Sequence, residues 1–191
     1  IKFLENAQDP YGGGWRYRPK QAGDTSVSGW VVLALKTAKE AGVTIEPACL
    51  AKCIRFFEKC ETHANGRTGY ENGKTLHTEA TTGVGMLVHH FLLEKSDSDL
   101  VKAASSHLAD HAERAWGANR KQPPDYYLWY NCTLGMYLAG GVNWDKWNNV
   151  VRKQLEDLQV KSYKSCERGS WPPSDSWSSH GGRIYSTALA V

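Results

Sequence analysis

The sequence has no long apolar run and no strong excess of either charge. Spanning a membrane takes about 20 consecutive, mostly apolar residues, and no stretch of the 191 residues approaches this. We therefore expect no transmembrane segment in this chain. The formal net charge is only +3, which is too small to indicate a nucleic-acid-binding surface. Nucleic acid is accordingly not an expected partner.

The chain also lacks a recognisable cysteine pattern. Its five cysteines are odd in number and no pair has zinc-finger spacing, so we predict neither a disulfide framework nor a zinc finger. Cys49, Cys53 and Cys60 fall on one face of a helix predicted over 47–61. We interpret them as small apolar side chains rather than metal ligands.

No segment alternates apolar and polar residues over the length of a strand, so the sequence predicts an all-α protein. What it has instead is an internal repeat. Three segments combine the end of an amphipathic helix, a polar loop, and a small residue followed by an aromatic one. These pairs are Gly14-Trp15, Gly69-Tyr70 and Ser170-Trp171. A fourth unit, 107–130, keeps the helix and the loop without a clean pair.

A second helix of small and apolar residues follows each loop. Equivalent positions in these helices are spaced by 53, 50 and 55 residues: Trp30, Gly83, Thr133 and Ala188. Because they are apolar around most of their circumference, we expect them to be buried inner helices. They are predicted at 24–42, 77–94, 126–141 and 184–191. The helices at 47–61 and 144–159 carry polar stripes and are expected to form an outer layer.

Together these elements predict about four outer-helix/inner-helix repeats, each burying its apolar face against its neighbours. We expect a single repeat domain over 1–191. The first helix, IKFLENAQ, begins without a cap, and the last, RIYSTALAV, ends while its pattern continues. We therefore expect the chain to be a segment of a longer one.

Two loops carry a family resemblance. Gln8 to Trp15 (QDPYGGGW), and Gln159 followed by Gly169-Ser170-Trp171, resemble the QW repeat of the terpene cyclase and protein prenyltransferase superfamily. A closer likeness, over 13–30, 169–171 and 181–191, is to planctomycete-type prenyltransferase and squalene oxidase repeat proteins. The resemblance implies an (α/α) toroid, here an incomplete barrel. It also implies a structural role for Gln8, Trp15, Gln159 and Trp171.

The chemistry of that superfamily finds little support in the residues. Squalene-hopene-type cyclases use a DxDD motif, whose middle Asp must stay protonated in an apolar cavity. Here Ser96-Asp97-Ser98-Asp99 precedes a helix and is interpreted as a helix cap, and Asp175 stands alone. The zinc site of prenyltransferases has candidates by type only. Since no Asp–Cys pair lies close together, we predict no metal and no cofactor and assign no catalytic residue. The candidates by type are Asp24, His77, Cys132 and His180.

Two histidine pairs are also candidates for a site. His107 and His111 lie one helical turn apart, but no third metal ligand is placed beside them. His89 and His90 are adjacent on an inner helix. We interpret both pairs as surface histidines.

The repeat predicts that the N-termini of the inner helices share one rim of a funnel. Helix N-termini carry partial positive charge and unpaired N–H groups, and the loops at this rim are rich in aromatic and basic side chains, including Arg120 and Lys121 in the third loop. Such a concave mouth suits a ligand with apolar or sugar-like faces and some negative charge. The predicted ligand-binding rim consists of Arg16, Tyr17, Arg18, Asp24, Tyr70, His77, Tyr127, Trp177, His180, Arg183 and Tyr185.

Three functions remain open at this point. The favoured hypothesis is a toroid domain that binds a ligand or partner at the funnel mouth without catalysis. The ligand would be a small molecule, a lipid, a glycan-like compound or a protein. The first alternative is a squalene-hopene-type terpene cyclase whose catalytic acid lies outside this segment. The second is a polysaccharide lyase or hydrolase, because related helical toroids also serve such enzymes.

Overall fold

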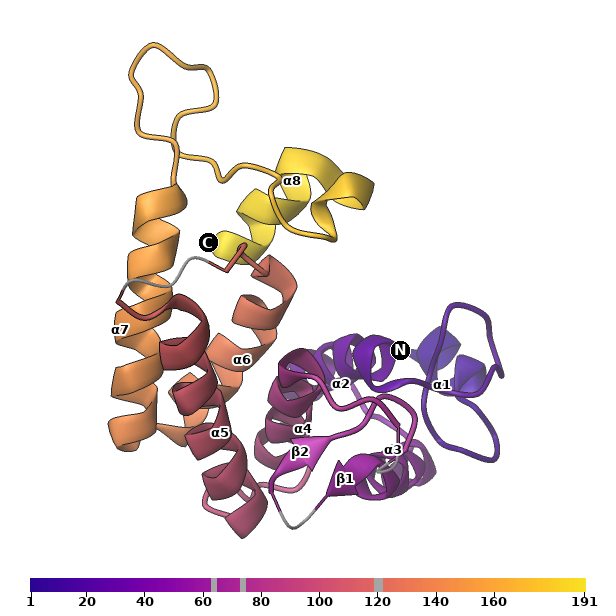
Figure 1. The fold of residues 1–191 in the computed structure, drawn as a ribbon. Coiled ribbons are helices and arrows are strands. Elements are labelled where there is room, and N and C mark those ends of the chain that lie inside the picture. The colour runs from indigo at the N-terminus through magenta and orange to yellow at the C-terminus, as the bar shows by residue number, and fades with distance from the viewer. Residues whose placement is uncertain (63–64, 73–74, 119–121) are drawn as a thin grey trace. The chain divides into compact units, whose positions relative to one another are not determined.

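The computed structural model describes residues 1–62, 65–72, 75–118 and 122–191, and their fold is helical (Figure 1). Arg120 and Lys121 lie outside the described residues. The all-α class is confirmed, with one two-stranded antiparallel ladder besides the helices. The helices are α1 (Lys2–Ala7), α2 (Thr25–Glu40), α3 (Pro47–Cys60), α4 (Glu79–Phe91), α5 (Asp99–Trp116), α6 (Tyr126–Ala139), α7 (Gly141–Leu158) and α8 (Ser178–Ala190). The ladder pairs β1 (Glu61–Thr62) with β2 (Arg67–Thr68).

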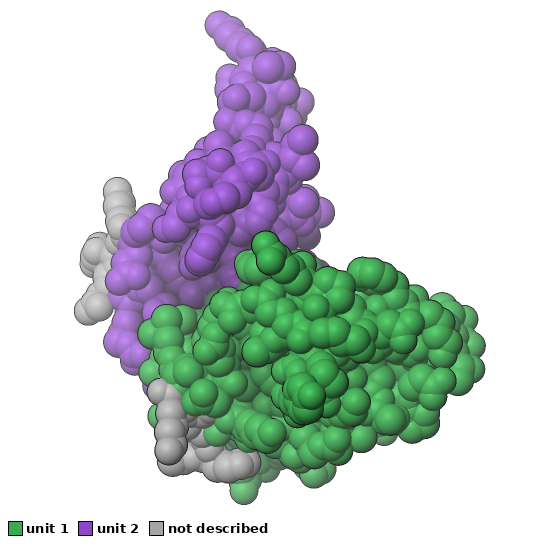
Figure 2. Space-filling view, turned by 90° about the vertical axis from the view of Figure 1, so that its right-hand side faces the viewer, with its two compact units in different colours: residues 1–104 green, residues 105–191 purple. Residues whose placement is uncertain are grey.

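Contacts divide the chain into two compact units, residues 1–104 and residues 105–191 (Figure 2). That both belong to one toroid stays a prediction. Within the described ranges, none of the helices combines the length and the apolar character that crossing a membrane requires.

In unit 1, α2 and α4 lie side by side and run in the same direction (Figure 1). At their N-terminal ends, the Thr25 hydroxyl donates to the carbonyl of Gly69, in the loop that leads into α4. Further along, Gly29 lies against Val84. Towards the C-terminal ends, the ammonium of Lys36 lies 5.9 Å from the ring centre of Phe91. Contacts at three successive levels fix the two helices as parallel neighbours.

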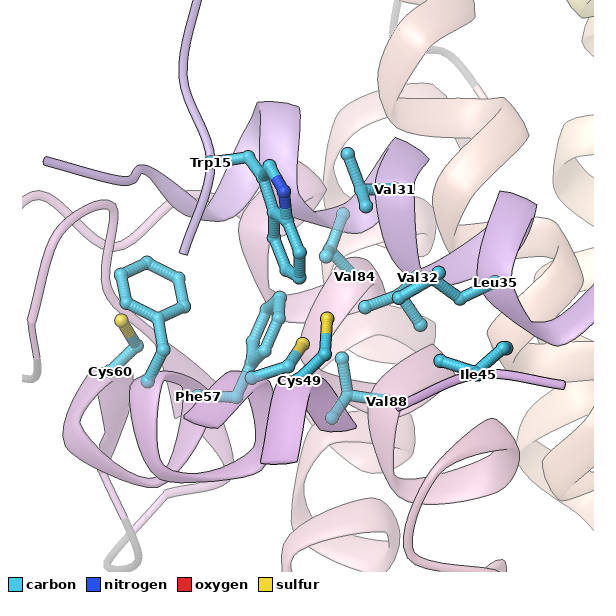
Figure 3. Close-up of a cluster of buried hydrophobic side chains, with 12 residues drawn as sticks. Trp15, Val31, Val32, Leu35, Ile45, Cys49, Phe57, Cys60, Val84 and Val88 are labelled. Atoms are coloured by element: carbon cyan, nitrogen blue, oxygen red, sulfur yellow. The ribbon is translucent and has the colours of Figure 1, made fainter. Parts of the chain in front are cut away.

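The core of unit 1 lies where α2, α3 and α4 meet, with one residue from the first loop (Figure 3). It joins Trp15 to apolar side chains that include Val32 of α2, Phe57 of α3 and Val84 of α4. The three cysteines of α3 belong to this cluster and are at most 5% exposed. Their interpretation as buried apolar residues is therefore confirmed.

The starts of the helices follow from capping side chains. Asp24 caps α2, its Oδ1 accepting from the N–H of Val27 at 2.8 Å. Asp125 caps α6 in the same way. Thr78, rather than the preceding His77, caps α4 in a reciprocal capping box with Thr81. Helix α4 therefore starts later than the predicted residue 77. Its first N–H groups have no partner within the helix, and the Thr78 side chain is placed to accept from them.

Two further helix starts bear on the sequence predictions. The Ser98 hydroxyl accepts from the N–H of Val101 at 3.3 Å, so the 96–99 segment does provide the cap of α5. The last helix begins at Ser178, before the predicted start at 184, but its backbone breaks at Gly182, where φ is +61°. The expected inner helix corresponds to the part after this break.

Unit 2 is built around α6, which contacts both α7 and α8. Its core is aromatic. Trp129 of α6 packs edge to face against Trp116 at 5.3 Å and against Tyr126 at 5.6 Å between ring centres. Trp147 of α7 is fully buried, and its indole N–H donates to the Thr133 hydroxyl at 2.9 Å.

The helices predicted to be inner helices differ in burial. Every residue of α4 from Ala80 to His90 is buried, as predicted for a helix covered on both sides. By contrast, α2 leaves Trp30 41% exposed. The expectation that all of these helices are buried around their circumference is therefore too broad, because α2 exposes part of its surface.

Candidate functional site

The loop between α1 and α2 is held by its glutamine and its tryptophan. The Gln8 side chain is 4% exposed, and its amide Nε2 donates to the carbonyls of Gly13 at 2.8 Å and Cys49 at 3.0 Å. The indole N–H of Trp15 donates to the carbonyl of Leu4 at 2.8 Å. These bonds tie the loop to α1 behind it and to α3 beside it, and they give the buried Gln8 amide its hydrogen-bond partners.

The loop between α7 and α8 in unit 2 repeats this pattern. Gln159 Nε2 donates to the carbonyl of Gly169 at 3.0 Å, and the indole N–H of Trp171 donates to the carbonyl of Leu155 at 2.8 Å. In both loops the tryptophan bonds the carbonyl four residues before the glutamine. The loops differ in length, and Gln159 has no counterpart to the bond with Cys49 among the described residues.

A glycine makes the same turn in both loops. Gly13 and Gly169 each have φ of +88°, a conformation that L side chains rarely adopt. At Gly13 there is a second restriction, since a Cβ would lie 2.2 Å from the carbonyl oxygen of Lys52. The positive φ therefore explains why a glycine stands two residues before each tryptophan.

Beyond Trp15, the loop carries the side chains that sequence analysis assigned to a rim. Arg16 lies between two carboxylates: its Nη1 is 2.8 Å from Glu71 Oε1 and its Nε is 3.4 Å from Asp24 Oδ2. Its guanidinium also lies 5.9 Å from the ring centre of Tyr70. The side chain of Asp24 is fully buried, whereas those of Arg16 and Glu71 are 27% and 45% exposed.

Tyr70 shares the environment of this charged cluster. Burial raises the pKa of its phenol, and the negative charge of Asp24 raises it further. Tyr17 directly follows Arg16 in the loop, and its charge adds a smaller upward contribution to the pKa of Tyr70. Tyr17 is 83% exposed and Arg18 is exposed as well. We call Arg16, Tyr17, Arg18, Asp24, Tyr70 and Glu71 the rim of unit 1.

His77 lies at the edge of this rim. It forms an isolated bridge with Gly69, and its carbonyl accepts from Arg67 Nη2 at 2.7 Å. Glu71 was missed by sequence analysis. Its position directly after the Gly69-Tyr70 pair was the available indication, since the equivalent position after Gly14-Trp15 is Arg16.

The remaining predicted rim residues belong to unit 2. Arg183 of α8 bonds the loop between α7 and α8, with Nη2 3.0 Å from Glu167 Oε1 and Nη1 donating to the Ser170 hydroxyl at 3.1 Å. Trp177 is 53% exposed and His180 is exposed. Burial raises the pKa of Tyr185, and the nearby Asp175, Asp125 and Tyr127 raise it further. Tyr127 lies in the first turn of α6 and Tyr185 lies in α8, and these two helices are in contact.

Asp175 is the buried acid of this region, 9% exposed. Its Oδ1 accepts from the N–H and the hydroxyl of Ser178, and its Oδ2 accepts from the N–H of Tyr126 at 3.1 Å. A group that protonates an alkene must present an O–H. All three contacts use the Asp175 carboxylate as an acceptor, which does not match a group that presents an O–H.

The interpretation of His89 and His90 as surface residues is wrong. They are 7% and 8% exposed, because α4 is covered on both sides. His89 Nε2 lies 2.8 Å from Glu61 Oε1, and its Nδ1 lies 3.1 Å from the hydroxyl of Ser98. His90 Nδ1 lies 2.7 Å from the hydroxyl of Ser96.

Other candidate positions stay separate. His111 packs edge to face on Trp116 at 5.4 Å, and the thiol of Cys132 is buried in unit 2. Among the residues that the structure describes, no group of three or more histidine, cysteine, aspartate or glutamate side chains could hold a metal ion. None of the family models, curated proteins or solved structures compared with the chain matches it.

Proposed function

We propose that the protein is a ligand-binding domain of the squalene-cyclase and prenyltransferase repeat type, and that the rim of unit 1 binds a glycan-like ligand without chemistry. The observation that carries the proposal is the Arg16–Glu71 pair, held over the buried Asp24 beside the exposed Tyr17. The repeat assignment is supported by the two loops that share one hydrogen-bond pattern around Gln8 and Gln159.

The rim is built to hold its polar groups in place. Asp24 fixes the Nε side of Arg16, and Glu71 fixes Nη1. Ordering long side chains before a ligand arrives lowers the entropy cost of binding. The backbone N–H of Glu71 also donates to the Thr75 hydroxyl at 2.8 Å, which orders the residue that carries the second carboxylate.

The chemistry of the rim suits a sugar better than an anion. Two carboxylates already neutralise Arg16, so it has little attraction left for a phosphate or sulfate. A pyranose ring has an apolar C–H face and hydroxyl groups around its edge. The exposed ring of Tyr17 suits the face, while the second Glu71 oxygen and Arg16 Nη2 offer an acceptor and a donor for neighbouring hydroxyls.

The cyclase alternative has less support. Asp24 and Asp175 are buried carboxylates near the starts of α2 and α6, and both accept hydrogen bonds. These bonds use both side chains as acceptors, whereas a cyclase acid must donate a proton to an alkene. The cyclase alternative still requires a catalytic acid from outside this segment.

The proposal is tested by titrating the chain with neutral cello-, chito- and xylo-oligosaccharides in a calorimeter. At least one series should bind, and Tyr17→Ala should weaken its binding about tenfold, or about 1.4 kcal/mol. Glu71→Gln should also weaken it, because the amide keeps the shape but loses the charge that orients Arg16.

Tyr163→Ala is the matched control. Tyr163 is 85% exposed, like Tyr17, but belongs to unit 2. Its removal should leave oligosaccharide affinity unchanged. If no oligosaccharide binds, or if Tyr17→Ala and Tyr163→Ala bind equally well, the rim of unit 1 is not a glycan site.

A further inference from the structure

A second group of reactive side chains in unit 1 plays no part in the rim. Glu61, His89 and Ser98 form a continuous hydrogen-bonded chain, with 2.8 Å from Glu61 Oε1 to His89 Nε2 and 3.1 Å from His89 Nδ1 to Ser98 Oγ. The side chains of Glu61 and His89 are 3% and 8% exposed, while Ser98 is partly exposed. We propose that this triad, the Ser98 triad, hydrolyses small carboxylic esters.

Three separate elements bring the triad together. Glu61 is in β1, which pairs with β2 in register Glu61 to Thr68. Thr68 in turn lies against Gly85 and accepts on its carbonyl from the Thr81 hydroxyl at 2.7 Å, so the ladder lies along α4. His89 is on α4 itself, and Ser98 immediately precedes α5. The arrangement depends on tertiary packing and not on neighbouring sequence.

The geometry assigns a role to each member. A carboxylate can only accept, so Glu61 fixes the ring proton of His89 on Nε2. The other ring nitrogen, Nδ1, is then the unprotonated base that faces the Ser98 hydroxyl. A nucleophile hydrogen-bonded to a base, which is oriented by a third group, is the arrangement that activates a serine.

The reaction proceeds in two balanced stages. Ser98 Oγ forms a bond to the ester carbonyl carbon while its proton passes to His89 Nδ1. The C–O bond to the alcohol then breaks, and the departing oxygen takes the proton from Nδ1. Water next attacks the acyl-serine, giving its proton to Nδ1, and the carboxylic acid leaves as Ser98 regains its hydrogen.

The N-terminus of α5 supplies hydrogen-bond donors for the transient oxyanion. The backbone N–H groups of Asp99 and Leu100, in the first turn of that helix, have no acceptor within the helix. An oxyanion on a carbon bonded to Ser98 Oγ would form beside them and at the positive end of the helix dipole.

The neighbouring pair provides a matched control. His90 Nδ1 lies 2.7 Å from Ser96 Oγ in the same loop, but Ser96 does not immediately precede the first turn of α5. Ser96→Ala removes a serine bonded to a histidine and leaves the Ser98 triad intact.

The first experiment is labelling of the 191-residue chain with a fluorophosphonate, followed by peptide mass spectrometry. Phosphonylation should occur at Ser98, where Oγ replaces fluoride on phosphorus. It should persist in Ser96→Ala and disappear in Ser98→Asn, which keeps a side chain able to cap α5. Circular dichroism of Ser98→Asn establishes that the chain remains folded.

The second experiment is hydrolysis of p-nitrophenyl acetate in a Cys166→Ser background, since that exposed thiol would also react. His89→Ala should lower kcat/KM by at least about 100-fold, and Glu61→Gln by at least about tenfold. Absence of a Ser98 adduct in the parent chain would overturn the proposal. Equal hydrolysis by the folded Ser98→Asn variant would do the same.

Discussion

The two loop glutamines differ at the level of single hydrogen bonds. Gln8 is 4% exposed and bonds two carbonyls, whereas Gln159 is less buried and bonds one. Gln8→Ala removes the donor to the Gly13 carbonyl and the second bond to the Cys49 carbonyl, and should lower the free energy of unfolding by about 1–3 kcal/mol. Gln159→Ala should cost about 0.5–1.5 kcal/mol.

Urea denaturation of both variants, followed by tryptophan fluorescence, measures the difference. The comparison is internally matched because the two loops share their glycine and tryptophan bonds. An equal or larger loss for Gln159→Ala would show that the bond to Cys49 contributes nothing to stability.

Some single-residue environments could be predicted from the sequence, and others could not. The cysteines of α3 were predictable, since their spacing alone places them on one helical face. His89 was not, because its burial depends on β1 and on the loop before α5, and neither contact is encoded by neighbouring residues. Glu71 was missed for the same reason, since it becomes part of the rim only through its ion pair with Arg16 across 55 residues.

At the scale of elements, the contact between α2 and α4 depends on one glycine. A Cβ at Gly29 would lie 2.6 Å from Val84 Cγ1, which belongs to a buried valine. Alanine would favour the helix by about 1 kcal/mol, but overpacking a core typically costs about 1–3 kcal/mol. Gly29→Ala should therefore destabilise the protein on balance.

A double-mutant cycle separates the two effects. Val84→Ala alone leaves a cavity and is destabilising, but it makes room for a methyl group at position 29. The loss of unfolding free energy in the double variant should thus be smaller than the sum of the losses in the two single variants, by about 0.5–3 kcal/mol. A coupling energy near zero, from thermal or urea unfolding, would mean that α2 and α4 do not pack here.

Element positions were predictable because hydrophobic periodicity is local. All four predicted inner helices have counterparts, and the polar-striped helices correspond to α3 and α7. Their ends were less predictable. The start of α4 depends on the capping box of Thr78, and the break in α8 depends on the backbone at Gly182, so composition alone could not distinguish these positions from their neighbours.

At the scale of the whole molecule, the sequence could predict repeats but not how they close. Each repeat buries its apolar face against its neighbours, so the periodic pattern specifies only nearest contacts. The repeated loop bonds around Gln8 and Gln159 are present in both units. Formation of the predicted funnel would depend on rotations between repeats, which no local pattern determines.

Global stability should fall in alkaline solution, because burial raises the pKa values of several thiol and phenol groups in both units. It raises the pKa of Cys60 from 9.0 to about 11, and it also raises the pKa values of Cys53, Tyr126 and Tyr185. Above pH 9 the unfolded chain therefore loses protons that the folded chain keeps. The free energy of unfolding should be level below pH 9 and decrease between pH 9 and about 11, by about 1.4 kcal/mol for each pKa unit of a fully buried group.

Urea denaturation at pH 8, 9, 10 and 11 in the presence of a reductant measures this slope. Cys60→Ala is the specific control: it lowers stability at every pH, but it removes one titrating group and should make the decline between pH 9 and 11 shallower. A slope identical to that of the parent chain would show that the Cys60 thiol is not held protonated by the core. An increase in stability over the same interval would contradict the burial of all four groups, because only a folded state that loses protons more readily than the unfolded chain gains stability as pH rises.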